Sequence, residues 1–263
     1  MAKHWTEKLF IDEAELFKTT LVERMGRTEA EIDGLLNIFS EYSVPKKAAI
    51  LDLACGIGRH SVPLAEKGYK VVGVDLSPSY ISAAEKYAED RGVSQNTRFI
   101  VGDMKRLEEL LSDSMESFDA VVNLFTSMGY WDEETDRTIF TQALNLVRPQ
   151  GLLVIHTANR DFLIKNFQAR DFTISEEGRV FFTERRLDLE TSRIYNVWRY
   201  YDMKGEDMTH LSTVEIDHRL YSLHELKKLV EDSGWRYQTC YGGFGTQPFT
   251  IDTFSMLLIA KKP

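Results

Sequence analysis

The feature that most constrains the fold is a regular alternation of short apolar runs and helical stretches between residues 48 and 157. The runs predict buried strands, and the stretches between them predict helices of about ten to fifteen residues. We expect strands at 49–53, 70–75, 97–101, 119–123 and 152–157, and helices at 59–67, 78–91 and 133–147. This order predicts an α/β fold, a Rossmann-like, doubly wound, mainly parallel sheet with right-handed crossovers.

The chain before this region is expected to be helical. Thr28 and Glu31 have the spacing of a capping box, and apolar residues follow them at the i, i+3, i+4, i+7 spacing of an amphipathic helix. Residues 5–25 predict a helix or a helix pair that lies against the main domain. We therefore interpret residues 1–45 as an N-terminal helical lid.

After residue 160 the alternation stops. Strands are expected at 180–187, 192–201 and 208–220, with turn signals at 188–191 and 204–207. This pattern predicts an inserted antiparallel β cap at 161–220. A helix at 222–233 and strands at 236–240 and 253–260 are expected to complete the Rossmann-like core of residues 46–160 and 221–263.

The amino-acid composition limits which kinds of partner the protein can bind. The 263 residues include 32 Lys and Arg against 41 Asp and Glu, a formal charge of −9, which argues against a general polyanion binder. No apolar run approaches the ~20 residues that span a bilayer, so a cytoplasmic protein with no membrane partner is expected. Cys55 and Cys240 cannot form a disulfide framework, and no Cys or His spacing resembles a zinc site, so no metal is expected.

Residues suited to binding a ligand cluster at the ends of the first two predicted strands. Gly56 and Gly58 allow a sharp turn and close approach of a ligand, and Asp75 at the end of the second strand can accept both ribose hydroxyls. This predicts an adenosine pocket. A dinucleotide fold would place a third glycine where Ser61 stands, and Asp52 in the first strand suits a cationic ligand better than two phosphates.

Four segments carry a resemblance to a known family. They are Asp52-Leu-Ala-Cys-Gly56-Ile-Gly58, Val74-Asp75-Leu-Ser77, Gly102-Asp103-Met104 and Phe118-Asp-Ala-Val-Val-Asn123. Their sequence and order resemble the successive motifs of class I S-adenosylmethionine-dependent methyltransferases over about residues 48–160. The resemblance implies an enzyme with S-adenosyl-L-methionine as its cofactor.

The resemblance also implies roles for individual residues in cofactor binding. Gly56 and Gly58 would line the methionine part in the loop that holds Asp52 and Ala54, Asp75 would bind the ribose, Leu76 would pack on adenine, Asp103 and Met104 would meet the adenine amine and ring, and Asn123 and Leu124 would lie under the sulfonium. Asp52 could alternatively be a structural carboxylate. Arg27 could pair with the cofactor carboxylate, or serve only in capping or at the surface.

Candidates for acceptor binding follow the fourth and fifth strands. Phe125, Ser127 and Tyr130 follow the fourth strand, and Asn159 and Arg160 follow the fifth. His218 and Tyr221, where the cap returns to the core, are the predicted catalytic contacts. The alternatives are a surface loop for the first group, a salt bridge for Arg160, and sheet packing for most cap residues.

The sequence thus predicts a methyltransferase that acts on a nitrogen or oxygen of a small-molecule acceptor. The cap and the lid are similar in architecture to those of sugar amine N-methyltransferases and glycine N-methyltransferase. An RNA or protein methyltransferase, a nicotinamide-dependent oxidoreductase and a cofactor-binding protein without transfer are the alternatives. A nucleic-acid partner is not expected, and a homodimer is left open.

Overall fold

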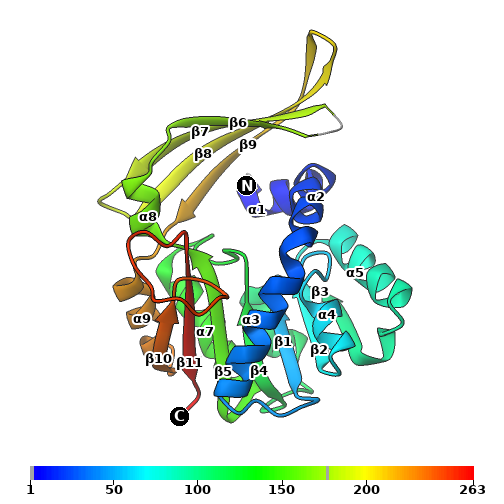
Figure 1. The fold of residues 1–263 in the computed structure, drawn as a ribbon, viewed down its shortest axis with the longest axis vertical. Coiled ribbons are helices and arrows are strands. Elements are labelled where there is room, and N and C mark those ends of the chain that lie inside the picture. Colours follow the sequence, from blue (N-terminus) through cyan, green and yellow to red (C-terminus); the bar gives the residue numbers. More distant parts are fainter. Residues whose placement is uncertain (1–2, 176–177) are drawn as a thin grey trace.

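The core of the protein is a central seven-stranded sheet. The computed structural model describes residues 3–175 and 178–263. The spatial order of the sheet is β10-β11-β5-β4-β1-β2-β3 (Figure 1). The strands are β1 (Ala49–Leu53), β2 (Lys70–Asp75), β3 (Thr97–Val101), β4 (Phe118–Asn123), β5 (Val147–Ala158), β10 (Arg236–Tyr241) and β11 (Ser255–Lys261). Only β11 runs against its neighbours. The predicted mainly parallel, doubly wound sheet is confirmed.

Helices cover both faces of this sheet. Ile50 packs with Leu35 and Val62, whereas the next residue, Leu51, packs with Phe140, because successive strand side chains point to opposite faces. One face therefore carries α3 (Thr28–Glu41), α4 (Ser61–Glu66) and α5 (Pro78–Asp90), and the other carries α6 (Leu107–Leu110), α7 (Glu133–Leu146) and α9 (Leu223–Asp232). Both faces are apolar because both are buried.

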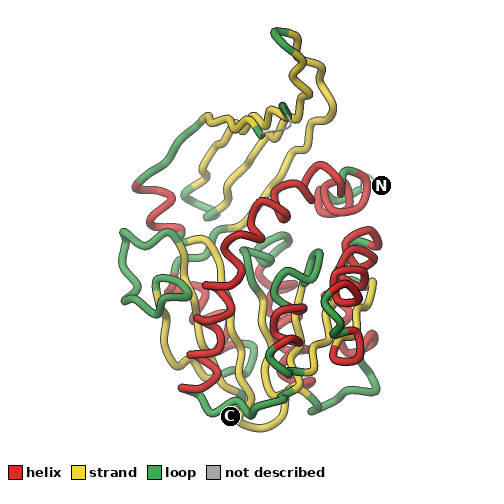
Figure 2. Tube along the Cα trace, turned by 45° about the vertical axis from the view of Figure 1, so that its right-hand side comes forward, coloured by secondary structure: helices red, strands yellow, loops and turns green. Residues whose placement is uncertain are grey.

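The N-terminal segment lies between the core and a second sheet (Figures 1 and 2). It consists of α1 (Trp5–Glu7), the π turn η1 (Lys8–Asp12), α2 (Ala14–Glu23) and the 3-10 turn η2 (Arg24–Arg27). The Tyr80 hydroxyl of the core donates to the Ala14 carbonyl at 2.9 Å, and the Phe17 ring stacks on Trp198 of the second sheet at 5.9 Å. No helix in the described part of the chain is long and apolar enough to cross a bilayer.

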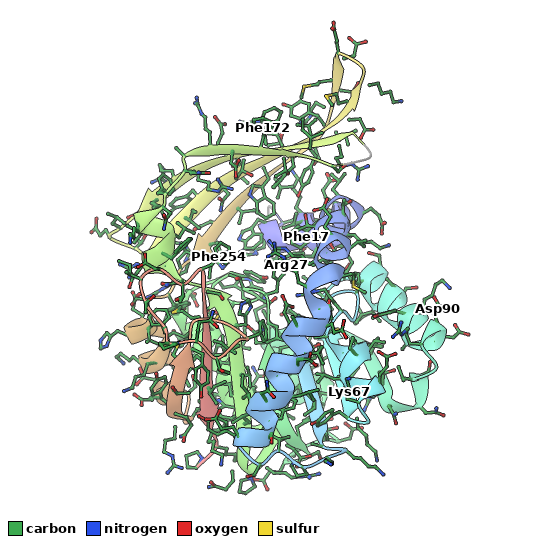
Figure 3. All side chains as sticks on the ribbon, viewed as in Figure 1. Phe17, Arg27, Lys67, Asp90, Phe172 and Phe254 are labelled. Atoms are coloured by element: carbon green, nitrogen blue, oxygen red, sulfur yellow. The ribbon has the colours of Figure 1, made fainter. Side chains whose placement is uncertain are left out.

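The second sheet is antiparallel, in the order β6-β7-β8-β9. Its strands are β6 (Arg170–Ile174), β7 (Arg179–Asp188), β8 (Arg193–Lys204) and β9 (Asp207–Arg219), preceded by α8 (Arg160–Lys165). The sequence did not predict β6 or α8. All five residues of β6 are exposed, including Phe172, which is 59% exposed and labelled in Figure 3, so β6 lacks the alternation that marks a half-buried strand.

The capping box predicted at Thr28 and Glu31 is wrong. Thr28 is the first helical residue of α3, and Arg27 before it makes no side-chain cap. Thr28 Oγ1 instead accepts from Arg59 Nη1 at 3.3 Å, and the Glu31 carboxylate binds Arg59 and His60. These polar side chains anchor α3 to the turn before α4, which begins at Ser61 rather than at residue 59.

The fifth strand begins earlier than predicted. Val147 pairs with Phe118 and Leu152 pairs with Ala120, so the four residues 148–151 stand opposite the single residue Asp119 and form a bulge on the β5 side. Gln150 within the bulge has φ 67°. A turn signal in the sequence therefore marks an irregularity inside a longer strand.

Close packing of α3 on the loop after β10 gives a test of this arrangement. A Cβ at Gly34 would lie 2.2 Å from the Phe244 carbonyl oxygen, whereas a Cβ at Gly26 would meet nothing within 4 Å. We expect Gly34→Ala to lower the free energy of unfolding by about 1–3 kcal/mol, because the backbone must shift despite the better helix propensity of alanine. Gly26→Ala is the matched control, and urea unfolding measures both. Equal stability of the two variants would contradict the packing.

Candidate functional site

A cleft opens at the carboxyl ends of β1, β2 and β4, where β1 and β4 lie side by side and their connections diverge. Open α/β sheets bind ligands at such a point. The empty volume of the cleft is about 890 Å³, and this figure includes the open solvent at its mouth. Its walls are the turn after β1, the ends of β2 and β3, the loop 124–131 after β4, and four side chains of the N-terminal segment, Thr6, Phe10, Phe17 and Leu21.

Asp75 is fixed at the end of β2. Its carboxylate accepts from the Gly56 N–H at 2.8 Å and from the Ser77 N–H at 2.9 Å. Burial raises the pKa of Asp75 to about 6, and the two backbone N–H groups oppose this rise. The carboxylate is therefore mostly charged at neutral pH and is held in place in the cleft wall. Gly56 has φ +55°, a conformation that favours glycine at this turn.

Asp52 and Ser61 form a buried pair beneath the same turn. The Ser61 hydroxyl donates to the Asp52 carboxylate at 2.6 Å, and Asp52 is 2% exposed. Burial raises the pKa of Asp52 to about 7, while the Ser61 hydrogen bond lowers it. A carboxyl group thus stands where a dinucleotide-binding fold brings pyrophosphate to a helix N-terminus. This pair suits an amino group of a ligand better than a phosphate.

Two charged side chains lie over the Phe125 ring, which lines the cleft. The guanidinium groups of Arg24 and Arg59 lie 5.0 and 5.6 Å from its centroid. Burial alone would raise the pKa of Glu31, but His60 and Arg59 lower it to about 2. Arg59 is therefore matched by a carboxylate. Among residues 3–175 and 178–263, no carboxylate lies within ion-pair distance of Arg24.

Most of the predicted cofactor residues line this cleft. They are Asp52, Ala54, Gly56, Asp75, Leu76, Asp103, Met104 and Leu124. Three of the predicted cofactor residues do not line the cleft. Gly58 packs against α5, where a Cβ on residue 58 would lie 3.0 Å from the Ala84 Cβ. Asn123 is 1% exposed and donates to the Leu53 and Ser127 carbonyls, and Arg27 is exposed.

The predicted acceptor residues divide in the same way. Phe125, Ser127 and Tyr130 line the cleft. Asn159 caps α8 and donates to the carbonyls of Thr250 and Thr253 at 2.9 and 2.7 Å. Arg160 forms an ion pair with Glu225 at 2.9 Å. The structure therefore gives Asn159 and Arg160 partners outside the cleft lining.

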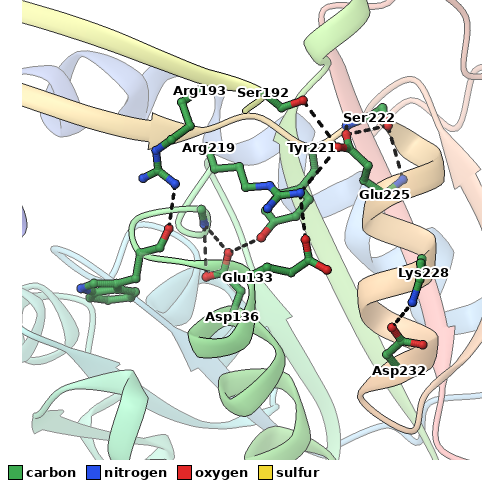
Figure 4. A network of polar contacts seen from close by, with 12 residues as sticks. Glu133, Asp136, Ser192, Arg193, Arg219, Tyr221, Ser222, Glu225, Lys228 and Asp232 are labelled. Carbon is green, nitrogen blue, oxygen red and sulfur yellow. Dashed lines mark hydrogen bonds and ion pairs between the residues drawn. The ribbon is translucent and has the colours of Figure 1, made fainter. Parts of the chain in front are cut away.

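His218 and Tyr221, predicted as catalytic contacts, lie behind the loop 124–131 rather than in the cleft lining. His218 Nε2 lies 2.7 Å from the Met128 carbonyl, and burial lowers its pKa to about 4, so the neutral ring donates to that carbonyl. The Tyr221 hydroxyl donates to Asp136 at 2.7 Å, and Asp136 also accepts from the Gly129 N–H (Figure 4). Both side chains hold the loop in place, and neither lines the cleft.

The cap sheet reinforces this loop at two more points. The Arg219 N–H donates to the Gly129 carbonyl at 2.8 Å, and Arg193 Nη1 donates to the Trp131 carbonyl at 3.0 Å. The Arg219 guanidinium lies 2.8 Å from the Glu133 carboxylate (Figure 4). Arg193 at the start of β8 and Arg219 at the end of β9 thus hold the loop 124–131 in place.

Sequence reasoning missed several lining residues. They are Thr6, Phe10, Phe17, Leu21, Arg59, His60, Tyr80 and Trp131. The aromatic residues before residue 25 predicted either core or lid, and nothing in the sequence showed which of them would face the cleft. Arg59 and His60 follow the glycine turn directly, and that adjacency was the one available signal.

Comparisons with known proteins agree with this geometry. A family described as "Methyltransferase domain" matches residues 50–151. The putative methyltransferase YqeM of Bacillus subtilis (strain 168) is 28% identical over 215 residues, which cover 79% of this chain and 82% of that protein. Residues 50–151 of this chain thus form a methyltransferase domain. Matches to the next three curated relatives span only 49%, 50% and 41% of their lengths.

Solved structures show that this methyltransferase shares its whole fold with others. An S-adenosylmethionine-dependent methyltransferase from Clostridium acetobutylicum ATCC 824 has a TM-score of 0.79 at 16% identity, with 95% of this chain and 99% of that chain covered. The sugar N-methyltransferase KedS8 from Streptoalloteichus sp ATCC 53650 has a TM-score of 0.69 at 21% identity, with 93% and 92% covered. At these identities the likeness shows the fold.

The Glu31 cluster predicts a pH-dependent stability. The pKa of Glu31 falls from 4.5 to about 2, so its contribution is fully present above pH 4.5 and is lost as the pH falls towards 2. We expect Glu31→Gln to lower the free energy of unfolding by about 1–3 kcal/mol at neutral pH, and the difference to shrink in acid. Urea unfolding across this range measures it, with exposed Glu29→Gln as control. A difference that does not change with pH would contradict the assignment.

Proposed function

We propose that this methyltransferase binds S-adenosyl-L-methionine in the cleft and transfers a methyl group to a nitrogen or oxygen of a small-molecule acceptor. The observation that carries the proposal is the Asp75 carboxylate, which the Gly56 and Ser77 N–H groups hold at the end of β2. A charged, oriented carboxylate at this position can accept two vicinal ribose hydroxyls.

The other lining residues complete a site for the cofactor. Leu76 and Met104 supply apolar contacts for adenine, and Asp103 can accept from its exocyclic amine. The turn at Ala54 and Gly56 leaves room for the methionine part, and Leu124 at the tip of β4 would lie near the sulfonium. When bound, the cofactor supplies an activated methyl group on a sulfonium. The protein then has to orient the acceptor and exclude water.

Arg24 suits the cofactor carboxylate better than the predicted Arg27. Neither arginine is itself a lining residue, but the Arg24 guanidinium is partly buried over the Phe125 ring, which lines the cleft, whereas Arg27 is exposed. Burial lowers the pKa of Arg24, and the neighbouring charges of Arg27 and Arg59 lower it further. A ligand carboxylate would relieve this repulsion among the three guanidinium groups.

A small acceptor fits the surroundings of the cleft. The N-terminal segment supplies four lining residues, and the charged side chains of the lining are Asp52, Asp75 and Asp103 against Arg59. Such a wall lacks the positive charge that RNA requires. The fold shared with a sugar N-methyltransferase also supports a small acceptor. A homodimer and a cytoplasmic location stay predictions.

Ligand titration tests the cofactor assignment. We expect calorimetry to detect micromolar binding of S-adenosylhomocysteine and no binding of NAD. Asp75→Asn should weaken S-adenosylhomocysteine binding by about 10- to 100-fold, because the loss of a charged hydrogen-bond acceptor costs about 1.5–3 kcal/mol. Asp90→Asn is the matched control, since Asp90 lies at the exposed end of α5 (Figure 3). Binding of NAD alone, or equal affinities of the two variants, would contradict the proposal.

A second titration tests Arg24. S-adenosylhomocysteine carries a carboxylate, and 5′-methylthioadenosine has the same adenosine and sulfur without it. Arg24→Gln should weaken binding of the first about tenfold and leave the second unchanged, because one charge-assisted hydrogen bond is lost. Arg27→Gln should change neither. Equal weakening of both ligands by Arg24→Gln would show that Arg24 serves only to pack on Phe125.

A further inference from the structure

Thr6 is a polar residue of the cleft lining that the cofactor assignment leaves unused. It is 2% exposed and lies in α1, the first helix of the described chain. Its hydroxyl oxygen lies 2.8 Å from Nδ1 of His4, and its backbone N–H donates to the same nitrogen at 3.4 Å. A threonine and a histidine are thus paired at the edge of the cleft.

The backbone contact fixes the direction of the hydroxyl hydrogen bond. A backbone N–H can only donate, so Nδ1 of His4 carries no proton and acts as an acceptor. The Thr6 hydroxyl therefore also donates to Nδ1. Its oxygen keeps two lone pairs, and so Thr6 offers a hydrogen-bond acceptor to the cleft rather than a donor.

The surroundings of His4 keep its ring neutral. Burial lowers the pKa of His4 below 6.5, and the positive charge of Lys105 lowers it further, as does that of Arg193 more weakly. Glu7 and Asp217 act in the opposite direction. The ring is only partly buried, so it can exchange a proton with solvent.

Contacts of α1 place Thr6 on the acceptor side of the cleft. The Trp5 ring packs edge-on against Tyr130 with centroids 5.0 Å apart, and the His4 ring stacks on Trp131 at 5.8 Å. Tyr130 and Trp131 belong to the loop after β4 and line the cleft with Thr6. Ser127, a hydroxyl of that loop that also lines the cleft, already donates to the Leu124 carbonyl at 2.9 Å.

The lining residues that come from the N-terminal segment and from the loop 124–131 carry no charge of their own, although Arg24 and Lys105 lie over the Phe125 and Trp131 rings. Besides Ser127 and Thr6, they are Phe10, Phe17, Leu21, Leu124, Phe125, Tyr130 and Trp131. Burial raises the pKa of the Tyr130 hydroxyl well above its ordinary value, so that hydroxyl stays neutral. An acceptor that enters this part of the cleft is therefore uncharged and has an apolar or aromatic body.

We propose that Thr6 Oγ1 accepts a hydrogen bond from the nucleophilic atom of the methyl acceptor, and that His4 receives the proton of that atom through the Thr6 hydroxyl. The inference rests on the proposed function and deepens it. The acceptor is then a neutral amine or hydroxyl compound that keeps an N–H or O–H bond on the atom to be methylated. Its lone pair is left free to point at the methyl group.

The proton balance of the step is complete. As the bond from nitrogen or oxygen to the methyl carbon forms, the bond from that carbon to sulfur breaks and its electron pair neutralises the sulfonium. The acceptor proton passes to Thr6 Oγ1 while the Thr6 hydroxyl proton passes to His4 Nδ1. The imidazolium of His4 then releases its proton to solvent.

This arrangement predicts a loss of activity in acid. When His4 is protonated, Nδ1–H donates to Thr6 Oγ1, and the Thr6 hydroxyl hydrogen turns towards the cleft. Two donors then face each other, so the ligand is no longer held. The rate should fall as the pH drops through the pKa of His4, below 6.5.

The test uses methyl transfer from methyl-labelled S-adenosylmethionine by the full chain. The probes are aniline, phenol and N,N-dimethylaniline, which share one ring and are neutral near neutral pH; only the last has no hydrogen on its nucleophilic atom. The variants are Thr6→Val, Thr6→Ser and His4→Asn. Thr20→Val in α2 is the matched control, because Thr20 does not line the cleft.

We expect transfer to aniline or phenol and none to N,N-dimethylaniline. Thr6→Val should raise the KM for aniline and phenol at least tenfold and leave the affinity for S-adenosylhomocysteine unchanged. Thr6→Ser keeps the hydroxyl group, so its KM should be close to that of the wild-type protein. Asparagine at position 4 can still accept from the Thr6 N–H but cannot take a proton. His4→Asn should therefore leave KM within about twofold and lower kcat by at least tenfold for phenol. It should also abolish the acidic fall in kcat measured at saturating S-adenosylmethionine, a condition that removes the effect of Asp75 on cofactor binding.

Four results would overturn the proposal about Thr6 and His4. If the wild-type protein still binds S-adenosylhomocysteine, these results leave the proposed function intact. They are transfer to N,N-dimethylaniline as fast as to aniline, transfer to none of the three probes, Thr6→Val with the kinetics of Thr20→Val, and an acidic limb that persists in His4→Asn. A wild-type protein that does not bind S-adenosylhomocysteine would instead overturn the proposed function itself.

Discussion

The geometry of the cleft depends on how one short loop is held. Residues 124–131 follow β4, and Phe125 and Thr126 in this loop have φ near +60°, a conformation that costs non-glycine residues about 1–3 kcal/mol each. Buried Asp136, the His218 ring and the Arg219 N–H fix the loop from behind. The strain is maintained because partners from α7, β9 and the cap root surround it.

The core of the fold could be predicted because its signals are local. A buried parallel strand needs a continuous apolar run, and a helix start needs a cap, so Ser77 and Asp132 mark α5 and α7 as the structure has them. The sequence-based prediction fails where a polar side chain binds a partner that is distant in the sequence. Glu31 has the spacing of a capping residue, but it binds Arg59 and His60 across 28 and 29 residues.

The candidate site divides along the same line. Asp75 and Asp103 could be found because each lies at or just after the carboxyl end of a strand, and the carboxyl ends of parallel strands meet at one edge. Thr6 and Arg24 could not be found, since helical periodicity does not say which residue of a lid faces the cleft. His218 was expected in the cleft because it lies near the return to the core, but its ring lies behind the lining, where it donates to the Met128 carbonyl and packs on Tyr130.

The place of the N-terminal segment has a consequence for folding. The Trp5 indole donates to the Asp217 carbonyl across 212 residues, and Lys8 donates to the Thr213 carbonyl across 205. Contacts between such distant residues form slowly, because a long loop must close before they contribute. The N-terminal segment, which is synthesised before the cap sheet, therefore docks only after β9, the last strand of that sheet, has formed. Until then the apolar side chains of α1 and α2 lack their partners and are open to chaperones and to aggregation.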